Sequence, residues 1–447
     1  MLFFRTVFLF TTSLPFTISF ASFLQKSPAM VSPPSSLAQT ATSITVGIVG
    51  ATGAVGMEMV KLFDKKNLPN LTVKLYASGR SAGKKVKTEN LKADDNTPFL
   101  TITEYNTEEV ANTCNVVLLA TSGDWAKEYV PQLHKLNPDL IVIDNSSAFR
   151  YDENIPLIVP EINGERDLLL NKEKKYDLKK NVLIANPNCT TAIMALIIAP
   201  LTQQFGKIKR MLVSTYQAAS GAGKGGMEEL EEQMTLYGEK NSLEKKKKVE
   251  EQSEVDDPLY QIVHDHYKEN NAVQQKRGVT KNDFAHPLIG NVIPHIDKPQ
   301  PNGYTKEEMK VSWETKKILG AGDDMKISCT AVRVPTMRAH AMTVVLEFED
   351  GGGNPVVNAE NARSLLTEKA DEFVFDVVDN LDENEYPMPV FAANKDKVQV
   401  GRIRKSEVFD NGIEFFVVGD QLLRGAALNA VLIAEMFFKV NAGNLGA

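Results

Sequence analysis

Cysteine is scarce in this chain of 447 residues, which contains three. So small and odd a number excludes a disulfide scaffold and most structural zinc sites. Basic residues are also in deficit, with 50 Lys and Arg against 57 Asp and Glu and a formal net charge of −7. Because no basic surplus can neutralise phosphates, the composition disfavours a nucleic-acid-binding protein. The hydrophobic content of 43% and charged content of 24% are ordinary for a globular protein, here of two or three domains.

Charge is almost absent from residues 1–43, which hold two cations, Arg5 and Lys26, and no acid. An uncharged apolar run follows Arg5 and closes on small residues, as in a signal peptide. The hydroxyl-rich stretch behind it is typical of an organelle transit segment. A transmembrane anchor is the weaker interpretation, because Thr, Ser and Pro interrupt the run. We expect a bipartite leader that directs the protein to a plastid, or alternatively to another organelle, and a mature protein outside the membrane.

A nucleotide-binding start is predicted for residues 44–56, ITVGIVGATGAVG, which read as a β-branched strand running into a glycine turn. Gly50, Gly53 and Gly56 have a G-x-x-G-x-x-G spacing, and a helix is expected from Met57 to Phe63. Glycines allow the backbone to approach a pyrophosphate, and the helix N-terminus offers N–H groups and a positive dipole end. Glycine-rich turns also occur for packing, but this one begins the folded part of the chain, where a first βα unit belongs.

The loop after the second expected strand (72–77) carries no acid and several basic or hydroxyl side chains: Arg80, Ser81, Lys84 and Lys85. An NAD enzyme usually places an acidic residue there to hold the ribose 2′-hydroxyl. A cationic loop instead suits a 2′-phosphate, which predicts NADP as the cofactor. The alternative is a solvated basic loop.

Further apolar runs at 115–120 and 140–143 alternate with helical stretches and end in polar residues. This alternation predicts a mostly parallel, doubly wound α/β sheet, whose ligands bind beyond the carboxyl ends of the strands. Arg150 follows the second run after two serines. We expect it to bind an anion rather than to form a surface ion pair.

Cys189 differs from the other two cysteines, because it follows Asn188 and opens an apolar helix expected over 190–201. A helix N-terminus lowers the pKa of a thiol and so raises its thiolate fraction. The Asn188 amide and nearby backbone N–H groups could stabilise an oxyanion. The alternative role for Cys189 is a helix cap. Cys114 and Cys329 lie in or beside apolar strand-like runs and are expected to pack as small hydrophobic side chains.

The histidines offer one candidate acid/base. His264 and His266 have no further ligand at metal spacing and lie in a highly charged stretch, so we expect them to be solvated. His340 ends the segment RVPTMRAH (333–340), in which Pro335 disfavours a helix. Arg333 could clamp a carboxylate with its planar fork, and His340 could exchange protons near neutral pH.

Seven segments, in order along the chain, together resemble the aspartate-semialdehyde dehydrogenase family. They are GIVGATGAVG (47–56), DNSSAFR (144–150), ANPNCTT (185–191), YQAASGAGK (216–224), EEMKVSWETKKIL (307–319), RVPTMRAH (333–340) and DQLLRGAALNA (420–430).

The resemblance implies a role for each matching residue. Cys189 matches the nucleophile that forms an acyl-thioester, His340 the acid/base, and Gln217 a residue that orients the substrate. Arg333 matches the partner of the substrate carboxylate. The other substrate- and phosphate-binding positions would be Arg150, Asn188, Glu307 and Lys310. The NADP-binding positions would be Gly50, Thr52, Gly53, Ala54, Val55, Arg80, Ser81, Ser220, Gly221 and Gln421, the last where relatives often carry Asn.

The implied activity is the NADPH-dependent reductive dephosphorylation of L-aspartyl 4-phosphate to aspartate 4-semialdehyde, a step in lysine, threonine, methionine and isoleucine biosynthesis. Two alternatives are a reductase of another acyl phosphate, such as N-acetyl-glutamyl phosphate, and a non-catalytic NADP-binding scaffold. RVPTMRAH and NPNCTT disfavour the first. The intact set of Cys189, Gln217, Arg333 and His340 disfavours the second.

The implied architecture is α/β: a Rossmann-type NADP-binding domain over 44–188 and an α+β catalytic and dimerisation domain over 189–420. The segment 421–447 would form a helix that returns to the first domain, and a homodimer or homotetramer is expected. A charged insertion is predicted near 239–282, since a family-like pattern resumes only around HPLIGNVIPHID (286–297).

Overall fold

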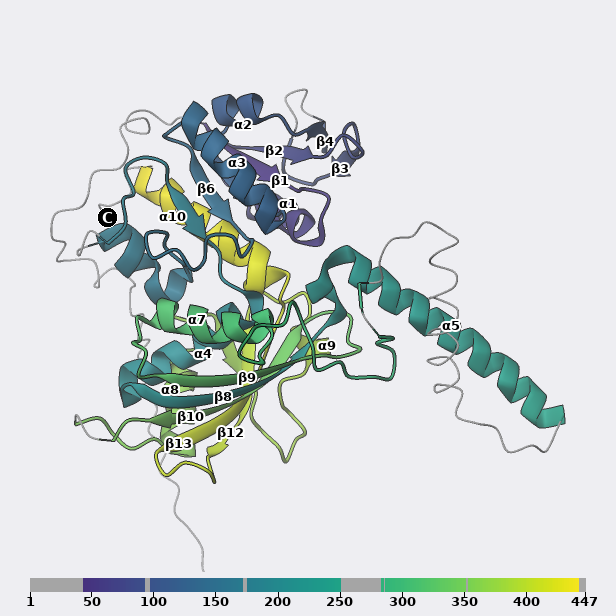
Figure 1. The fold of residues 1–447 in the computed structure, drawn as a ribbon, viewed down its shortest axis with the longest axis vertical. Helices are drawn as coiled ribbons and strands as arrows, with labels where there is room; N and C mark the ends of the chain where they lie inside the picture. The colour runs from purple at the N-terminus through teal and green to yellow at the C-terminus, as the bar shows by residue number, and fades with distance from the viewer. Residues whose placement is uncertain are drawn as a thin grey trace, which may run out of the picture.

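A computed structural model describes residues 43–92, 97–171, 175–250, 283–284, 286–350 and 353–441 (Figure 1). Residues 1–42 of the predicted leader lie outside this part of the chain, as do His264, His266 and the predicted insertion beyond Glu250. Within the described residues, no helix combines the length and apolarity needed to cross a membrane.

The N-terminal half contains a seven-stranded sheet in the order β3-β4-β2-β1-β5-β6-β7. The pairings are parallel except that between β3 and β4, so the predicted doubly wound parallel sheet is confirmed. Its strands are β1 (Ile44–Val49), β2 (Leu71–Ala77), β3 (Lys85–Lys87), β4 (Phe99–Glu104), β5 (Val116–Leu119), β6 (Ile141–Asp144) and β7 (Leu183–Ala185).

Helices cover both faces of this sheet. On one face, α2 (Thr107–Thr113) and α3 (Gly123–Leu136) pack through Val110 and Leu133 onto β1, β5 and β6. On the other, α1 (Ala54–Lys66) packs with α10 (Leu428–Asn441), the last helix in the part of the chain that the structure describes. The described part of the C-terminal segment therefore packs against the first half of the chain (Figure 1). A π-helical segment, η1 (Pro160–Leu170), precedes β7.

The second sheet has six strands in the order β11-β12-β13-β10-β8-β9 and mixes parallel with antiparallel pairs. One face is covered by α4 (Cys189–Phe205), which is buried along most of its length, and by α7 (Lys306–Leu319) and α8 (Ala359–Lys369). The strands are β8 (Ile208–Gln217), β9 (Lys326–Arg333), β10 (His340–Phe348), β11 (Phe375–Val377), β12 (Val398–Lys405) and β13 (Gly412–Gly419).

Four further segments complete the described fold. Helix α5 (Gly223–Glu250) follows the 3₁₀ turn η2 (Ala219–Ala222) and projects away from the body in Figure 1. It extends past the expected start of the insertion, so the first part of the insertion continues a helix. The short helix α9 (Pro389–Ala392) precedes β12, and the π-helical turn η3 (Leu423–Ala427) leads into α10.

Candidate active site

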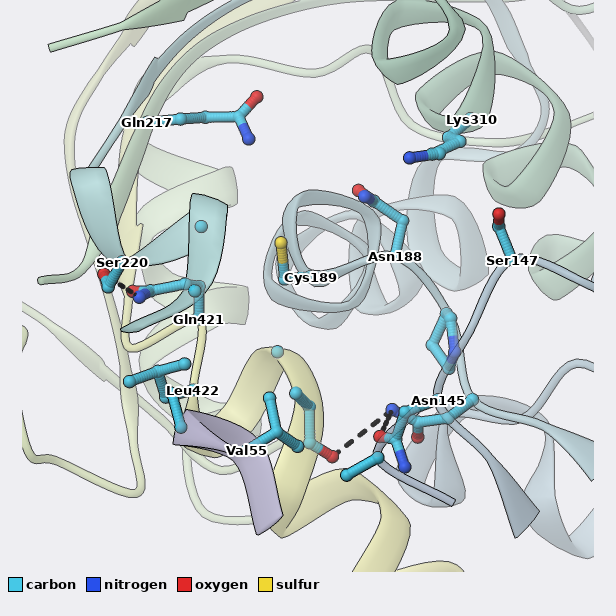
Figure 2. A pocket seen from close by; sticks show the side chains of 18 of the residues that line it. Val55, Asn145, Ser147, Asn188, Cys189, Gln217, Ser220, Lys310, Gln421 and Leu422 are labelled. Carbon is cyan, nitrogen blue, oxygen red and sulfur yellow. Dashed lines mark hydrogen bonds between the residues drawn. The ribbon is translucent and has the colours of Figure 1, made fainter. Parts of the chain in front are cut away.

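A cavity of about 380 Å³ lies where the two halves of the chain meet. Sequence-predicted site residues from both halves line it, together with residues that the sequence analysis gave no role (Figure 2). The predicted residues in its wall are Gly53, Ala54, Val55, Arg150, Asn188, Cys189, Gln217, Ser220, Gly221, Glu307, Lys310, Arg333 and Gln421. The wall also contains Ala120, Thr121, Asn145, Ser147, Asn186, Pro187, Gly223, Ile296, Leu422, Gly425 and Ala426.

The glycine turn forms one wall because its glycines permit contacts that side chains would block. Gly50 has φ +84°, and a Cβ there would come within 2.3 Å of the Ala120 carbonyl oxygen at the end of β5. A Cβ at Gly56 would come within 2.3 Å of the Gly50 oxygen. Gly53 caps α1 without a side chain, which leaves the first N–H groups of the helix for an anion. This cradle fits the pyrophosphate of a dinucleotide.

Arg80 and Ser81 lie after β2 and do not line the cavity. Strand β4 lies beside β2, with Glu104 paired to Ala77, and a Cβ on Gly79 would come within 2.6 Å of the Glu104 carboxylate. No acid directly follows β2 in the sequence, and we expected none at this strand end, but the fold brings one there. A carboxylate reaches the loop from the neighbouring strand.

Cys189 is the first residue of α4, as predicted, and its sulfur points into the cavity (Figure 2). The helix is capped by Asn188, whose Oδ1 accepts hydrogen bonds from the N–H groups of Thr190 (3.0 Å) and Thr191 (3.2 Å). Cys189 is therefore not itself the cap. Gly425 lies against it from η3, where an added Cβ would come within 2.6 Å of the Cys189 Cβ.

The predicted lowering of the Cys189 pKa by the helix end is wrong. Burial and the neighbouring Glu307 carboxylate raise the pKa of this thiol to about 11, against the opposing effects of Arg150 and Lys310. The other thiols, Cys114 and Cys329, are buried, as predicted.

Glu307, from the first turn of α7, joins three predicted residues. Its Oε1 accepts hydrogen bonds from the amides of Asn188 (3.0 Å) and Gln217 (3.1 Å), and its Oε2 pairs with the Lys310 ammonium at 2.9 Å. Burial acts to raise the pKa of Glu307, but Lys310 and the two amides lower it to about 2. Glu307 is therefore ionised and fixes the side chains on two sides of Cys189.

The two predicted phosphate-binding cations each have carboxylate partners. The Arg150 guanidinium contacts Glu314 Oε1 (3.1 Å) and the carbonyl oxygens of Asn186 (2.8 Å) and Asn145 (2.7 Å). Lys310 also pairs with Asp297 at 2.7 Å. Glu314 and Asp297 were given no role by the sequence analysis. A signal existed for Glu314, which stands in the same motif as Glu307 and seven residues after it, on the same face of a helix.

Arg333 and His340 lie together beneath Gly221, at the ends of β9 and β10. A Cβ at Gly221 would come within 2.6 Å of Arg333 Nη1 and 3.0 Å of His340 Nε2. Both side chains contact Ala218: its carbonyl accepts from Arg333 Nη1 (2.7 Å), and its N–H donates to His340 Nδ1 (3.1 Å). His340 itself does not line the cavity.

His340 is fully buried, and burial together with Arg333 lowers its pKa to about 3. The ring is therefore neutral at physiological pH. Because Nδ1 accepts the Ala218 N–H, the neutral ring carries its proton on Nε2, the nitrogen nearest Gly221.

Gln421 and Ser220, both predicted to bind the cofactor, are hydrogen-bonded to each other (Figure 2). The Gln421 carbonyl also accepts from the backbone N–H of Ala339 at 2.8 Å. Ala339 has φ +73°, a left-handed conformation unusual for alanine, and it directly precedes His340. Gln421 thus supports the backbone turn that orients the histidine.

The chain matches two descriptions of semialdehyde dehydrogenases. The "NAD binding domain" matches residues 45–168, and the "dimerisation domain" matches residues 198–424. The aspartate-semialdehyde dehydrogenase of Aquifex aeolicus is 36% identical over 394 residues, which cover 88% of this chain and 98% of the relative. That of Bacillus subtilis is 37% identical over 397 residues, which cover 89% and 98%.

Among solved structures, aspartate semialdehyde dehydrogenase II of Vibrio cholerae in complex with ASA is similar. Its TM-score is 0.67 at 30% identity, with coverage of 89% of this chain and 99% of the other.

Proposed function

Since this chain belongs to the aspartate-semialdehyde dehydrogenase family, we propose that it reduces L-aspartyl 4-phosphate to aspartate 4-semialdehyde through an acyl-thioester on Cys189. One observation carries the assignment. A single cavity brings the Cys189 thiol together with a dinucleotide cradle at Gly53–Val55 and with three cations, Arg150, Lys310 and Arg333. The substrate has one carboxylate and one phosphate, and those anions need fixed cationic partners on either side of the nucleophile.

Cys189 supplies the nucleophile. Its sulfur attacks the acyl carbon, a C–S bond forms, and the C–O bond to phosphate breaks. Arg150 and Lys310 bind the departing phosphate, while Arg333 holds the substrate carboxylate through its planar guanidinium. Because the pKa of the thiol is raised to about 11, its proton must leave as the sulfur attacks, and the departing phosphate is a suitable acceptor.

A nicotinamide cofactor, when bound, supplies the hydride that reduces the thioester. The carbonyl oxygen of the thioester would then carry a negative charge, which the Nε2–H of His340 is suited to stabilise by a hydrogen bond. Collapse of the oxyanion breaks the C–S bond and releases the semialdehyde and the Cys189 thiolate, which takes up one proton to restore the thiol. Gln217 and Asn188, both held by Glu307, keep the acyl group aligned.

The cofactor of this proposal is NADP. The support is the cationic loop with Arg80, Ser81 and Lys84, followed by Lys85 at the start of β3, which suits a 2′-phosphate. Glu104 beside Gly79 opposes that charge, so the preference for NADP over NAD should be moderate rather than absolute.

A homodimer or homotetramer is the proposed assembly. The face of the second sheet opposite α4 exposes two large side chains of β8, Leu212 (42% exposed) and Tyr216 (38%). Tyr216 also contacts the Phe416 ring, with the centroids 6.2 Å apart. An apolar open sheet face of this kind favours burial against a second copy. Tyr216→Glu should shift the species seen by light scattering toward the monomer.

Residues 1–43 are proposed to direct the precursor to a plastid, where the product would enter lysine, threonine, methionine and isoleucine synthesis. Their composition supports this, and a fluorescent fusion of residues 1–43 tests it. Fluorescence confined to the cytosol or the medium would overturn the localisation.

The activity is tested with residues 44–447, aspartate semialdehyde, NADP and phosphate, read in the oxidative direction as NADPH absorbance. We expect NADPH formation that depends on phosphate in the parent and none in Cys189→Ala. Turnover in the variant would exclude the thioester route. A preference for N-acetyl-glutamate semialdehyde would overturn the substrate assignment.

A further inference from the structure

Glu314 is a fully buried carboxylate on α7 that does not line the cavity. Three hydrogen-bond donors converge on it: the backbone N–H of Asn188 at 2.5 Å, Arg150 Nη1 at 3.1 Å and the Tyr151 hydroxyl at 3.4 Å. A buried charge is tolerated only when it is paired and hydrogen-bonded, and these contacts meet that requirement. Two of the donors belong to the residues nearest the chemistry.

The first of these donors belongs to the turn that presents Cys189. Asn188 caps α4, and its backbone N–H lies before the helix, where no helical carbonyl can accept it. Glu314 accepts that N–H, while Glu307, two helical turns earlier on α7, accepts the Asn188 side chain. Helix α7 therefore holds the residue before the nucleophile at two points, one on the backbone and one on the side chain.

The second donor to Glu314 that belongs to a residue near the chemistry is the Arg150 guanidinium. Its Nε and Nη2 donate to the carbonyls of Asn186 and Asn145, and Nη1 donates to Glu314. These contacts fix the plane of the guanidinium, which lies in the cavity wall. Glu314 also pairs with the charge of Arg150, one of the cations that act on the Cys189 thiol.

We propose that Glu314 is a positioning residue for this reaction: it fixes the Asn188–Cys189 turn and the Arg150 guanidinium relative to each other, so that the nucleophile and the phosphate meet at the same acyl carbon. The inference rests on the proposed function. Glu314 touches neither substrate nor cofactor, and it acts through Asn188 and Arg150.

Glu314→Gln keeps the volume but replaces one acceptor oxygen with an NH₂ group, so the Asn188 N–H and Arg150 can no longer both be satisfied. A misplacement of ~1 Å at a reacting group costs about 100-fold in rate, so kcat/KM for phosphate should fall about 100-fold. The KM for NADP should stay within about twofold, because the dinucleotide cradle lies on α1.

A second readout separates positioning from simple destabilisation. Glu307 raises the pKa of the Cys189 thiol, Arg150 and Lys310 lower it, and Arg333 also interacts with its charge. Without Glu314 the Arg150 charge is uncompensated, so the apparent pKa of iodoacetamide alkylation at Cys189 should fall by about one unit. This measurement needs no substrate.

The matched control is Glu308→Gln, on the same helix. Glu308 is also buried, but it accepts from Thr305 and Ala331 backbone N–H groups away from the cavity. Its loss should lower the melting temperature without shifting the alkylation pKa. Glu314→Asp restores the charge on a shorter side chain. It should recover about tenfold of the lost kcat/KM, which leaves it about tenfold below the parent, and should return the alkylation pKa to that of the parent.

Equal effects of Glu314→Gln and Glu308→Gln on the alkylation pKa and on kcat/KM for phosphate would overturn the proposal. If Glu314→Gln does not fold, Glu314→Asp decides: a lower kcat/KM at an unchanged melting temperature supports positioning, and an unchanged kcat/KM refutes it. A parent enzyme that turns over without phosphate would overturn the proposed function instead, and the alkylation measurement would still judge Glu314.

Discussion

Replacing Gly221 with alanine adds one methyl group at the point where Arg333 and His340 meet. The new Cβ would lie 2.6 Å from Arg333 Nη1 and 3.0 Å from His340 Nε2. Ordinary non-bonded contacts between heavy atoms are ~3.5–4.0 Å, so the guanidinium must retreat by about 1 Å. Gly221 does not have a positive φ, so the backbone itself accepts alanine. The substitution therefore displaces two functional groups while leaving their chemistry intact.

The expected cost follows from that displacement. A 1 Å misplacement costs about 100-fold in rate, equivalent to about 2.7 kcal/mol of transition-state stabilisation. Because Arg333 is assigned to the substrate carboxylate and His340 to the oxyanion, both kcat and KM for the semialdehyde should change. The folded state should lose little, since Gly221 and Arg333 both line the cavity and the guanidinium, the nearer neighbour, can move into it.

Steady-state kinetics of Gly221→Ala in the oxidative direction measure this loss, with the melting temperature recorded in parallel. Gly123→Ala is the matched control, because a Cβ there would make only ordinary contacts, the nearest at 3.7 Å, and Gly123 does not line the cavity. Wild-type kcat/KM in Gly221→Ala would refute the placement of Arg333 and His340 against the substrate. A loss confined to the KM for NADP would show instead that the methyl group blocks the cofactor.

Three further predictions concern titration and cofactor choice. The folded-state pKa of His340, about 3, lies below its unfolded value, so the free energy of unfolding should decrease as the pH falls from ~6.5 toward 3. In thermal melts, the melting temperature of His340→Asn should fall less over this pH range than that of the parent, and an equal fall would contradict the prediction. Cys189 alkylation by iodoacetamide should be slow at pH 7 and should accelerate up to about pH 11; a plateau near neutral pH would show a preformed thiolate. Arg80→Ala should raise the KM for NADP far more than that for NAD, whereas Glu104→Gln should lower the KM for NADP; equal effects on both cofactors would exclude a 2′-phosphate role.

Local signals in the sequence were sufficient for the elements that carry the nucleotide cradle and the nucleophile. The helix expected over Met57–Phe63 forms as α1 over Ala54–Lys66, and the helix expected after Cys189 begins at that residue. Both predictions rest on glycine spacing, capping and apolar runs, which act over a few neighbouring residues.

The features that were missed depend on contacts between distant segments. Glu104 reaches the loop after β2 because β4 is the next strand in the sheet, and strand order is not a local property. The raised pKa of Cys189 reflects burial and the approach of Glu307 from α7, more than a hundred residues away. The sequence correctly predicted that Cys189 lies at the N-terminus of a helix. It contains no information on how strongly the surrounding fold excludes solvent from the thiol.

The packing of α10 on α1 has a consequence for synthesis of the chain. The apolar face of α1 and the sheet behind it are completed by residues near the end of the sequence, such as Val431 and Ala434. Gly425, which lies against Cys189, also follows residue 188 by more than 200 residues. The nucleotide-binding half is thus discontinuous in sequence and cannot close its core from residues 44–188 alone. Its assembly, and with it the active site, must wait until residues 425–434 have been translated.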